Sequence, residues 1–110
     1  MVRDTKIKET ILSIVERIKD NYQPDKIILY GSYAYGRPGK DSDIDMLIIK
    51  QTEERPIDRR VFVRRLLSGL RGGYPFSSIV VTPEELKRRL EIGDQFFEEV
   101  VTKGEVLYAK

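Results

Sequence analysis

The sequence contains no cysteine and no histidine among its 110 residues. These absences exclude disulfides, thiolate zinc sites, cysteine nucleophiles and any mechanism that depends on an imidazole. No stretch approaches the roughly 20 apolar residues of a membrane-spanning helix, and residues 1–19 are charge-rich without the apolar core of a signal peptide. We therefore expect a soluble, cytoplasmic protein with one domain, residues 1–110, whose chemistry depends on carboxylates, hydroxyls and arginines.

The charges are distributed unevenly, although the formal net charge is only +2. Residues 55–71 include six arginines and one acid, whereas residues 84–99 include six acids and three basic residues. One surface should therefore attract phosphates and another should repel them. Four arginines are candidates for contact with a triphosphate or with nucleic acid, namely Arg59, Arg60, Arg64 and Arg65. The alternative is that they lie on a solvated helix face and form ion pairs.

Hydrophobic periodicity and turn residues predict the order of the elements. We expect a helix at 5–21, a strand at 26–30, a short helical turn capped by Ser32, a loop at 37–42, a strand at 43–49, a helix from about 56 to 72, a strand at 76–81, helices at 83–91 and 94–102, and a last strand at 106–108. This order predicts an α/β (α+β) domain in which a small mixed sheet is flanked by helices.

Asp43 and Asp45 are the most informative residues of the chain, because they lie in an otherwise apolar strand, IDMLII. Side chains in a strand alternate between faces, so the two acids share one face. Adjacent carboxylates repel each other, and a divalent cation such as magnesium commonly neutralises them. The alternative is a solvated sheet face or a charged edge strand, but the apolar residues that follow favour a central strand.

Gly31 and Ser32 follow the first predicted strand. Glycine lets the backbone approach a ligand closely, and amides at the start of a helical turn point outward toward anions. A Gly-Ser turn after a strand usually has only a structural role, but the sequence SDID at 42–45 favours a role in binding phosphate. Together they predict a phosphate-binding turn that faces the same pocket as the carboxylates, with Arg37 as a further candidate for phosphate contact.

The sequences GSYAYG at 31–36 and SDIDMLI at 42–48 resemble the GSxAxG and [ST]DxD[LM] signature of the minimal nucleotidyltransferases. This family is the small branch of the DNA polymerase beta-like superfamily. The resemblance covers residues 26–49 directly and extends to about residue 86. It implies the nucleotidyltransferase fold, ATP or another nucleoside triphosphate bound by Gly31, Ser32 and Ser42, and two magnesium ions on the catalytic residues Asp43 and Asp45.

The sequence departs from this family at one position. The family usually has a third carboxylate on the next strand, and counting back from Thr82-Pro83 places Ser77 there, or Ser78 if the alignment slips by one. Neither residue is acidic. Three interpretations remain open: a weakened site that still binds nucleotide and metal, replacement by another acid of the chain, or a group supplied by a partner.

The resemblance implies that a nucleoside monophosphate, most plausibly AMP, is transferred to a hydroxyl. Small members of the family resemble antitoxins that pair with a helical HEPN-type ribonuclease, so a tyrosine of such a toxin is the preferred acceptor. The alternative is a weakened module that binds nucleotide or a partner. A homo-oligomer is compatible with the sequence, whereas binding to nucleic acid is disfavoured because interleaved aromatic and basic strands are missing.

Overall fold

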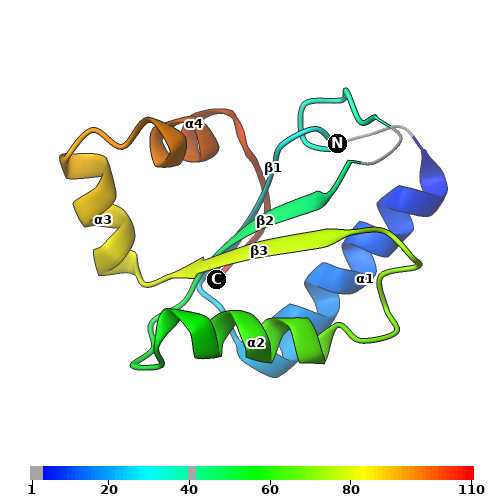
Figure 1. The fold of residues 1–110 in the computed structure, drawn as a ribbon, viewed down its shortest axis with the longest axis horizontal. Coiled ribbons are helices and arrows are strands. Elements are labelled where there is room, and N and C mark those ends of the chain that lie inside the picture. The colour runs from blue at the N-terminus through cyan, green and yellow to red at the C-terminus, as the bar shows by residue number, and fades with distance from the viewer. Residues whose placement is uncertain (1–3, 40–41) are drawn as a thin grey trace.

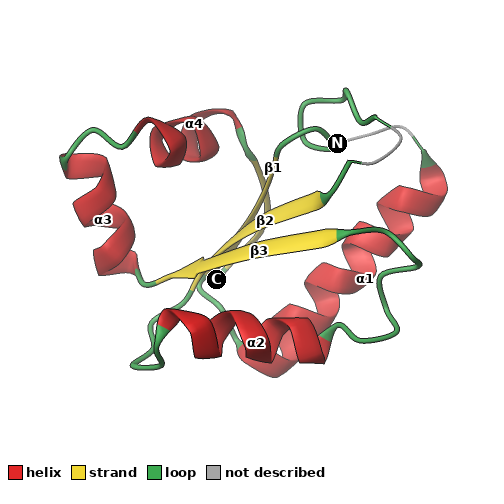
Figure 2. Cartoon of the chain, viewed as in Figure 1, coloured by secondary structure: helices red, strands yellow, loops and turns green. Residues whose placement is uncertain are grey.

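The structure is a computed structural model that describes residues 4–39 and 42–110. Lys40 and Asp41, which belong to the predicted loop at 37–42, lie outside the described residues. The elements are α1 (Thr5–Tyr22), β1 (Lys26–Tyr30), β2 (Ile44–Ile49), α2 (Pro56–Leu66), β3 (Phe76–Val81), α3 (Pro83–Glu91), α4 (Gln95–Lys103) and β4 (Glu105–Ala109). Figures 1 and 2 show their arrangement.

The strands form one sheet in the order β3-β2-β1-β4. Strand β1 runs antiparallel to β2 and β4, and β2 runs parallel to β3. The predicted mixed sheet flanked by helices is therefore confirmed. Strand β2 is central, as its apolar sequence indicates, while β3 has a free edge in the described part of the chain.

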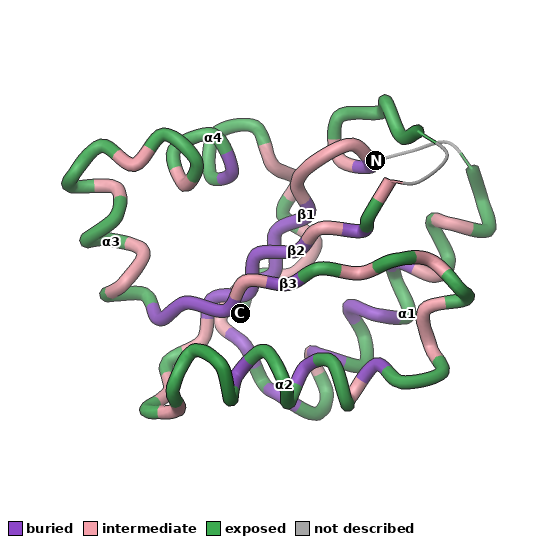
Figure 3. The backbone as a smooth tube through the Cα atoms, in the orientation of Figure 1, coloured by how far each residue is buried: buried purple, intermediate pink, exposed green. Residues whose placement is uncertain are grey.

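Helices cover both faces of the sheet (Figure 1). On one face, α1 and α2 pack against Ile27, Leu29 and Met46, and on the other, α3 and α4 pack against Ile28 and Leu47. Successive strand residues point to opposite faces, so the continuous apolar sequences of β1 and β2 serve both layers. Figure 3 shows the buried positions that run through the middle of the sheet and along α1.

Local capping explains why two helices begin where they do. Asp4 accepts hydrogen bonds from the backbone amides of Lys6 and Ile7 at the start of α1. Thr82 and Glu85 form a capping box at the start of α3, and Pro83 occupies the first turn. Among the described helices, none is long and apolar enough to cross a membrane.

The prediction for α2 was wrong in two respects. The helix ends at Leu66 rather than near residue 72, because the hydrogen bonds that follow connect residues three apart rather than four. One of them runs from the Leu70 amide to the Leu67 carbonyl oxygen. The apolar residues of the sequence also favour a buried side that includes Val61 and Phe62, but these are 38% and 41% exposed, whereas Val63 is buried. Val63 and Leu67 pack in the core, but the apolar residues of this segment lie on more than one side of the helix, so periodicity did not single out the buried side.

Two shorter elements also differ from the prediction. Strand β2 begins at Ile44 rather than Asp43, because its pairing with β3 starts with Ile44 opposite Phe76. The segment after β1 is the expected short turn, with the Ala34 and Tyr35 amides donating to the Gly31 carbonyl oxygen, but the Ser32 side chain forms no capping hydrogen bond with the described residues. The turn therefore offers no extended row of helical amides.

Candidate functional site

Three side chains lie in a row across the sheet at one end of β2. Asp45 is opposite Tyr30 of β1 and opposite Ser77 of β3. Neighbouring residues in register point to the same face of a sheet, here the face that also carries Leu47 and, further along, α3 and α4. Asp45 therefore has a hydroxyl-bearing residue on each side, at the end of the apolar layer.

The turn at Gly31 lies directly against the Asp45 carboxylate. Gly31 has a φ of +76°, and a Cβ atom at this position would overlap Asp45 Oδ2. Only glycine combines this left-handed conformation with so close an approach. The structure thus brings together the turn and the acid that the sequence analysis placed in one pocket.

The other candidates for nucleotide binding lie around this turn. Ser32 is half-buried within it, and its carbonyl oxygen accepts a hydrogen bond from the Arg37 amide. Arg37 itself is exposed. The Ser42 hydroxyl accepts a hydrogen bond of 2.6 Å from the Gly39 amide, so this side chain holds the loop and keeps its own proton free to donate.

Tyr33 has a structural role beside the loop. It is buried, and its hydroxyl donates to the Ser42 carbonyl oxygen at 3.4 Å. Tyr35 is 40% exposed. Of the two tyrosines in the turn, only Tyr35 therefore presents its ring to a ligand or partner.

The two aspartates differ in environment. Asp43 is exposed just before β2, whereas Asp45 is half-buried. Burial, with a smaller contribution from the Asp43 charge, raises the pKa of Asp45 from 3.8 to about 6. Burial and the nearby Asp45 raise the pKa of Tyr30 to about 12, which keeps this phenol protonated beside the carboxylate.

Magnesium fits this donor set. A desolvated carboxylate next to a second acid is an unfavourable arrangement that a hard divalent cation relieves. Among the described residues, no group of three metal-ligating side chains occurs, and Ser77 rather than Ser78 is the residue aligned with Asp45. Magnesium is typically bound by one or two carboxylates together with substrate phosphates and water, and Asp43 and Asp45 match that number of protein carboxylates.

Sequence reasoning missed two features of this region. Tyr30 was assigned only to a strand, although the antiparallel register places it opposite Asp45. Arg59 was a candidate for phosphate contact, but it is 4% exposed, and its guanidinium contacts Glu85 Oε1 at 2.7 Å and the Glu54 carbonyl oxygen at 2.8 Å. This arginine is a structural residue, because its donors are already used within the protein.

Comparisons with known proteins identify the family. The family model described as "Nucleotidyltransferase domain" matches residues 11–103, and the chain belongs to this family. Two proteins of Methanocaldococcus jannaschii are similar in sequence. "Putative protein adenylyltransferase MJ0604" is 34% identical over 104 residues, which are 92% of this chain and 97% of that protein. "Putative protein adenylyltransferase MJ1305" is 36% identical over 89 residues, which are 76% of this chain and 60% of that protein.

Solved structures share the fold. A nucleotidyltransferase-fold structure from Sulfolobus solfataricus has a TM-score of 0.65 at 21% identity and covers 96% of this chain and 82% of its own. A structure described as "the toxin-antitoxin with AMP-PNP" has a TM-score of 0.62 at 22% identity and covers 94% of this chain and 73% of its own. At these identities the comparisons establish the nucleotidyltransferase fold.

Proposed function

We propose that this chain is a magnesium-dependent nucleotidyltransferase that binds ATP and transfers AMP to a hydroxyl of a protein. The observation that carries this proposal is the contact between the Gly31 turn and the Asp45 carboxylate. It joins a site suited to phosphate with a site suited to a cation. Both relatives have the name "Putative protein adenylyltransferase", which supports AMP as the transferred group.

Different residues would contact the phosphates and hold the metal ion. Gly31 and Ser32 would contact phosphate oxygens, and Arg37 and the Ser42 hydroxyl lie close enough in the chain to assist. Asp43 and Asp45 would hold magnesium, which neutralises charge on the transferred phosphate and orients the reacting oxygens. In the transfer, the acceptor oxygen bonds to the α-phosphorus, the bond to pyrophosphate breaks, and the hydroxyl proton leaves to solvent.

Ser77 favours a second candidate function. In the row of three side chains, it occupies the position beside Asp45 where the resemblance expects a carboxylate. A serine provides neither the charge nor the basicity of that carboxylate. The alternative is therefore a module that binds nucleotide with magnesium and transfers AMP slowly, or only when a partner provides the missing acid.

The acceptor is inferred from structural neighbours. Two of them are described as the toxin-antitoxin MntA-HpeT and MntA-HepT, and a third as a toxin-antitoxin with AMP-PNP. We propose by analogy that a tyrosine hydroxyl of a helical HEPN-type toxin receives AMP and that this chain acts as the antitoxin.

Calorimetric titration with ATP tests the binding site. With magnesium, we expect the wild type to bind ATP, and we expect removal of magnesium or the double substitution Asp43→Ala and Asp45→Ala to reduce affinity at least about a hundredfold, on the scale of losing a main electrostatic ligand. Asp58→Ala, on the exposed side of α2, is the matched control and should bind normally. Unchanged binding in the double variant would refute the site.

Incorporation of labelled AMP into a co-purified toxin separates the two candidate functions. If the site is weakened by Ser77, the substitution Ser77→Asp should raise the rate of transfer by about tenfold or more. Ser78→Asp, one residue along but on the other face of β3, should give no increase. A wild-type rate that is already fast and falls in Ser77→Asp would contradict the weakened-site interpretation.

A further inference from the structure

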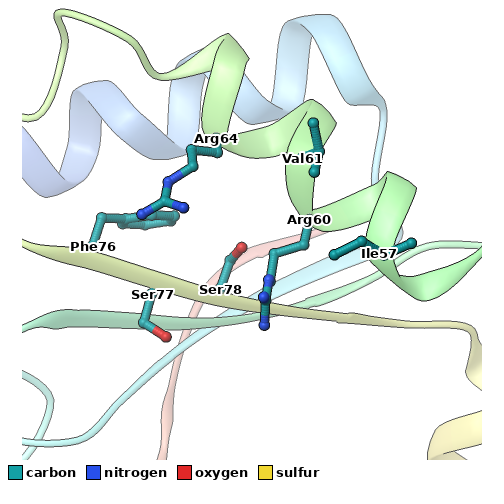
Figure 4. Close-up of a pocket in the computed structure, with 7 residues that line it drawn as sticks. All are labelled: Ile57, Arg60, Val61, Arg64, Phe76, Ser77 and Ser78. Atoms are coloured by element: carbon teal, nitrogen blue, oxygen red, sulfur yellow. The ribbon is translucent and has the colours of Figure 1, made fainter.

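A hollow lies between α2 and β3, and its arginines have no part in the proposed function. Its volume is about 280 Å³, and Figure 4 shows its side chains. The residues that line it are Ile57, Arg60, Val61, Arg64, Phe76, Ser77 and Ser78. Its lining therefore combines two guanidinium groups and hydroxyls with three apolar side chains, and none of these residues is acidic.

The hollow and the nucleotide site lie on opposite faces of β3. Ser77 pairs with Asp45, whereas Ser78 pairs with Met46, whose side chain belongs to the apolar layer of α1 and α2. In Figure 4 the Ser78 hydroxyl points toward α2, and the Ser77 hydroxyl points away from it. Arg60 and Arg64 come from the helix on the Ser78 side of β3, and Ser77 is the lining residue that the hollow shares with the row beside Asp45.

The polar side chains of the hollow have no hydrogen-bond or ion-pair partner among the described residues. Ser78 is 6% exposed, yet among the described residues its hydroxyl has no hydrogen-bond partner. Arg60 and Arg64 likewise form no ion pair with any acid in the described part of the chain, in contrast to Arg55 and Arg59 of the same helix. The Ser78 hydroxyl is not among the buried polar atoms of the described residues that lack a partner, so it faces the hollow, where it can donate to a bound acceptor group.

We propose that this hollow binds an acidic side chain of a partner polypeptide. The two guanidinium groups provide only donors, and the Ser78 hydroxyl can donate one more hydrogen bond, which together match the oxygens of a carboxylate. The apolar side chains Ile57, Val61 and Phe76 match the aliphatic stem of that acidic side chain. The partner's identity as the AMP acceptor rests on the proposed function, whereas the binding of a carboxylate does not.

The position beside a free strand edge favours a polypeptide over other anions. Strand β3 pairs only with β2 among the described strands, so its outer edge can hydrogen-bond the backbone of an added segment. Single-stranded nucleic acid instead uses an extended basic groove with aromatic stacking platforms. A second copy of this chain paired edge to edge would place the same arginines against each other, and like charges disfavour this contact.

Two capped pentapeptides test the proposal by nuclear magnetic resonance titration of the full chain. One has a central glutamate between valines, and the other has glutamine in its place. We expect the glutamate peptide to shift amide resonances of α2 and β3 and to bind at least about tenfold more tightly, as expected when a charge-assisted pair replaces a neutral one. Equal affinity for the two peptides, or an increase in protein size that shows self-association, would overturn the proposal.

Matched variants locate the binding. The double substitution Arg60→Gln and Arg64→Gln should weaken the glutamate peptide by about tenfold or more, whereas Arg65→Gln, an exposed arginine of α2 that does not line the hollow, should not. Ser78→Ala should cause a smaller loss. An effect of Arg65→Gln as large as that of the double variant would show non-specific attraction and refute the site.

Two further ligands separate this hollow from the nucleotide site. ATP with magnesium should neither compete with the peptide nor lose affinity in the double arginine variant. Competition by ATP would show that the arginines serve the nucleotide, and tighter binding of phenyl phosphate than of the glutamate peptide would show a phosphate site; either result overturns the proposal. If the chain fails to bind ATP but binds the peptide, the proposed function fails while this inference stands.

Discussion

Replacing Asp45 by asparagine should stabilise the protein while removing the proposed metal site. In the folded chain, burial and the Asp43 charge raise the pKa of Asp45 from 3.8 to about 6. The folded state therefore binds the Asp45 proton more tightly than the unfolded state does. The stability associated with this proton is complete below the unfolded pKa and is lost as the pH rises through about 6. At neutral pH the ionised carboxylate thus destabilises the fold.

The magnitude follows from the shift. Each pKa unit corresponds to about 1.4 kcal/mol, so the change from 3.8 to about 6 has an upper limit of about 3 kcal/mol. Asp45 is only half-buried, and solvent screening reduces the effect to roughly 1–2 kcal/mol. For a chain of this size, Asp45→Asn should therefore raise Tm by about 5 °C or more at neutral pH without divalent cations.

Thermal and urea denaturation at two pH values check this reasoning. At pH of about 4, where Asp45 is protonated in the folded wild type, most of the difference between the variant and the wild type should disappear. Asp43→Asn changes an exposed acid and should give a smaller gain. The argument is refuted if Asp45→Asn fails to stabilise the chain at neutral pH, or if the gain is as large at pH of about 4.

Further substitutions test the contacts around the site. Arg59→Met should lower the free energy of unfolding by about 2 kcal/mol, because it leaves buried acceptors unpaired, while the exposed Arg55→Met should change it by less than about 0.5 kcal/mol; equal losses in urea denaturation would contradict the structural role. Gly36→Ala should lower the free energy of unfolding by about 1 kcal/mol, because Gly36 has a φ of +75° but open space around it. Gly31→Ala should lower it further and also abolish ATP binding, because the added Cβ meets Asp45. Normal ATP binding by Gly31→Ala in calorimetry would exclude this contact as part of the site.

The sequence was sufficient wherever local chemistry determines the structure. Strands β1 and β3 and helix α3 have the predicted bounds, because they are branched apolar runs or helices enclosed by turn and capping residues. Thr82, Pro83 and Glu85 fix the start of α3 without help from the rest of the fold. A motif within four residues contains its own hydrogen-bond partners, so it can be recognised in the sequence.

The orientation of α2 required information from distant residues. Arg59 is buried because Glu85 and the Val80 carbonyl oxygen lie where its guanidinium reaches them, and these partners are more than twenty positions away in the chain. The guanidinium in turn holds the pKa of Glu85 below its usual value. No property of α2 alone distinguishes this arginine from Arg60, so sequence reasoning treated both as surface residues.

In the candidate site too, some features follow from the local sequence and others depend on distant residues. The sequence indicated that Gly31 and Asp45 belong together, because the motif places a turn and an acid at the ends of consecutive strands. It left open whether Ser77 or Ser78 stands beside the acid, since a shift of one residue exchanges the faces of a strand. The observed register selects Ser77, and only the structure could supply that register and the neighbouring Tyr30.

Strand β3 connects the two proposed sites through this alternation of faces. Ser77 lies beside the carboxylate of Asp45, and Ser78 lies in the hollow with Arg60 and Arg64. A polypeptide bound at the free edge of β3 would therefore place one side chain in the hollow on the Ser78 face. Its neighbouring residues would pass close to the face that carries Ser77 and Asp45. Binding energy from the hollow could position an acceptor hydroxyl without touching the nucleotide. Such positioning would matter most if Ser77 stands where the resemblance expects a third carboxylate.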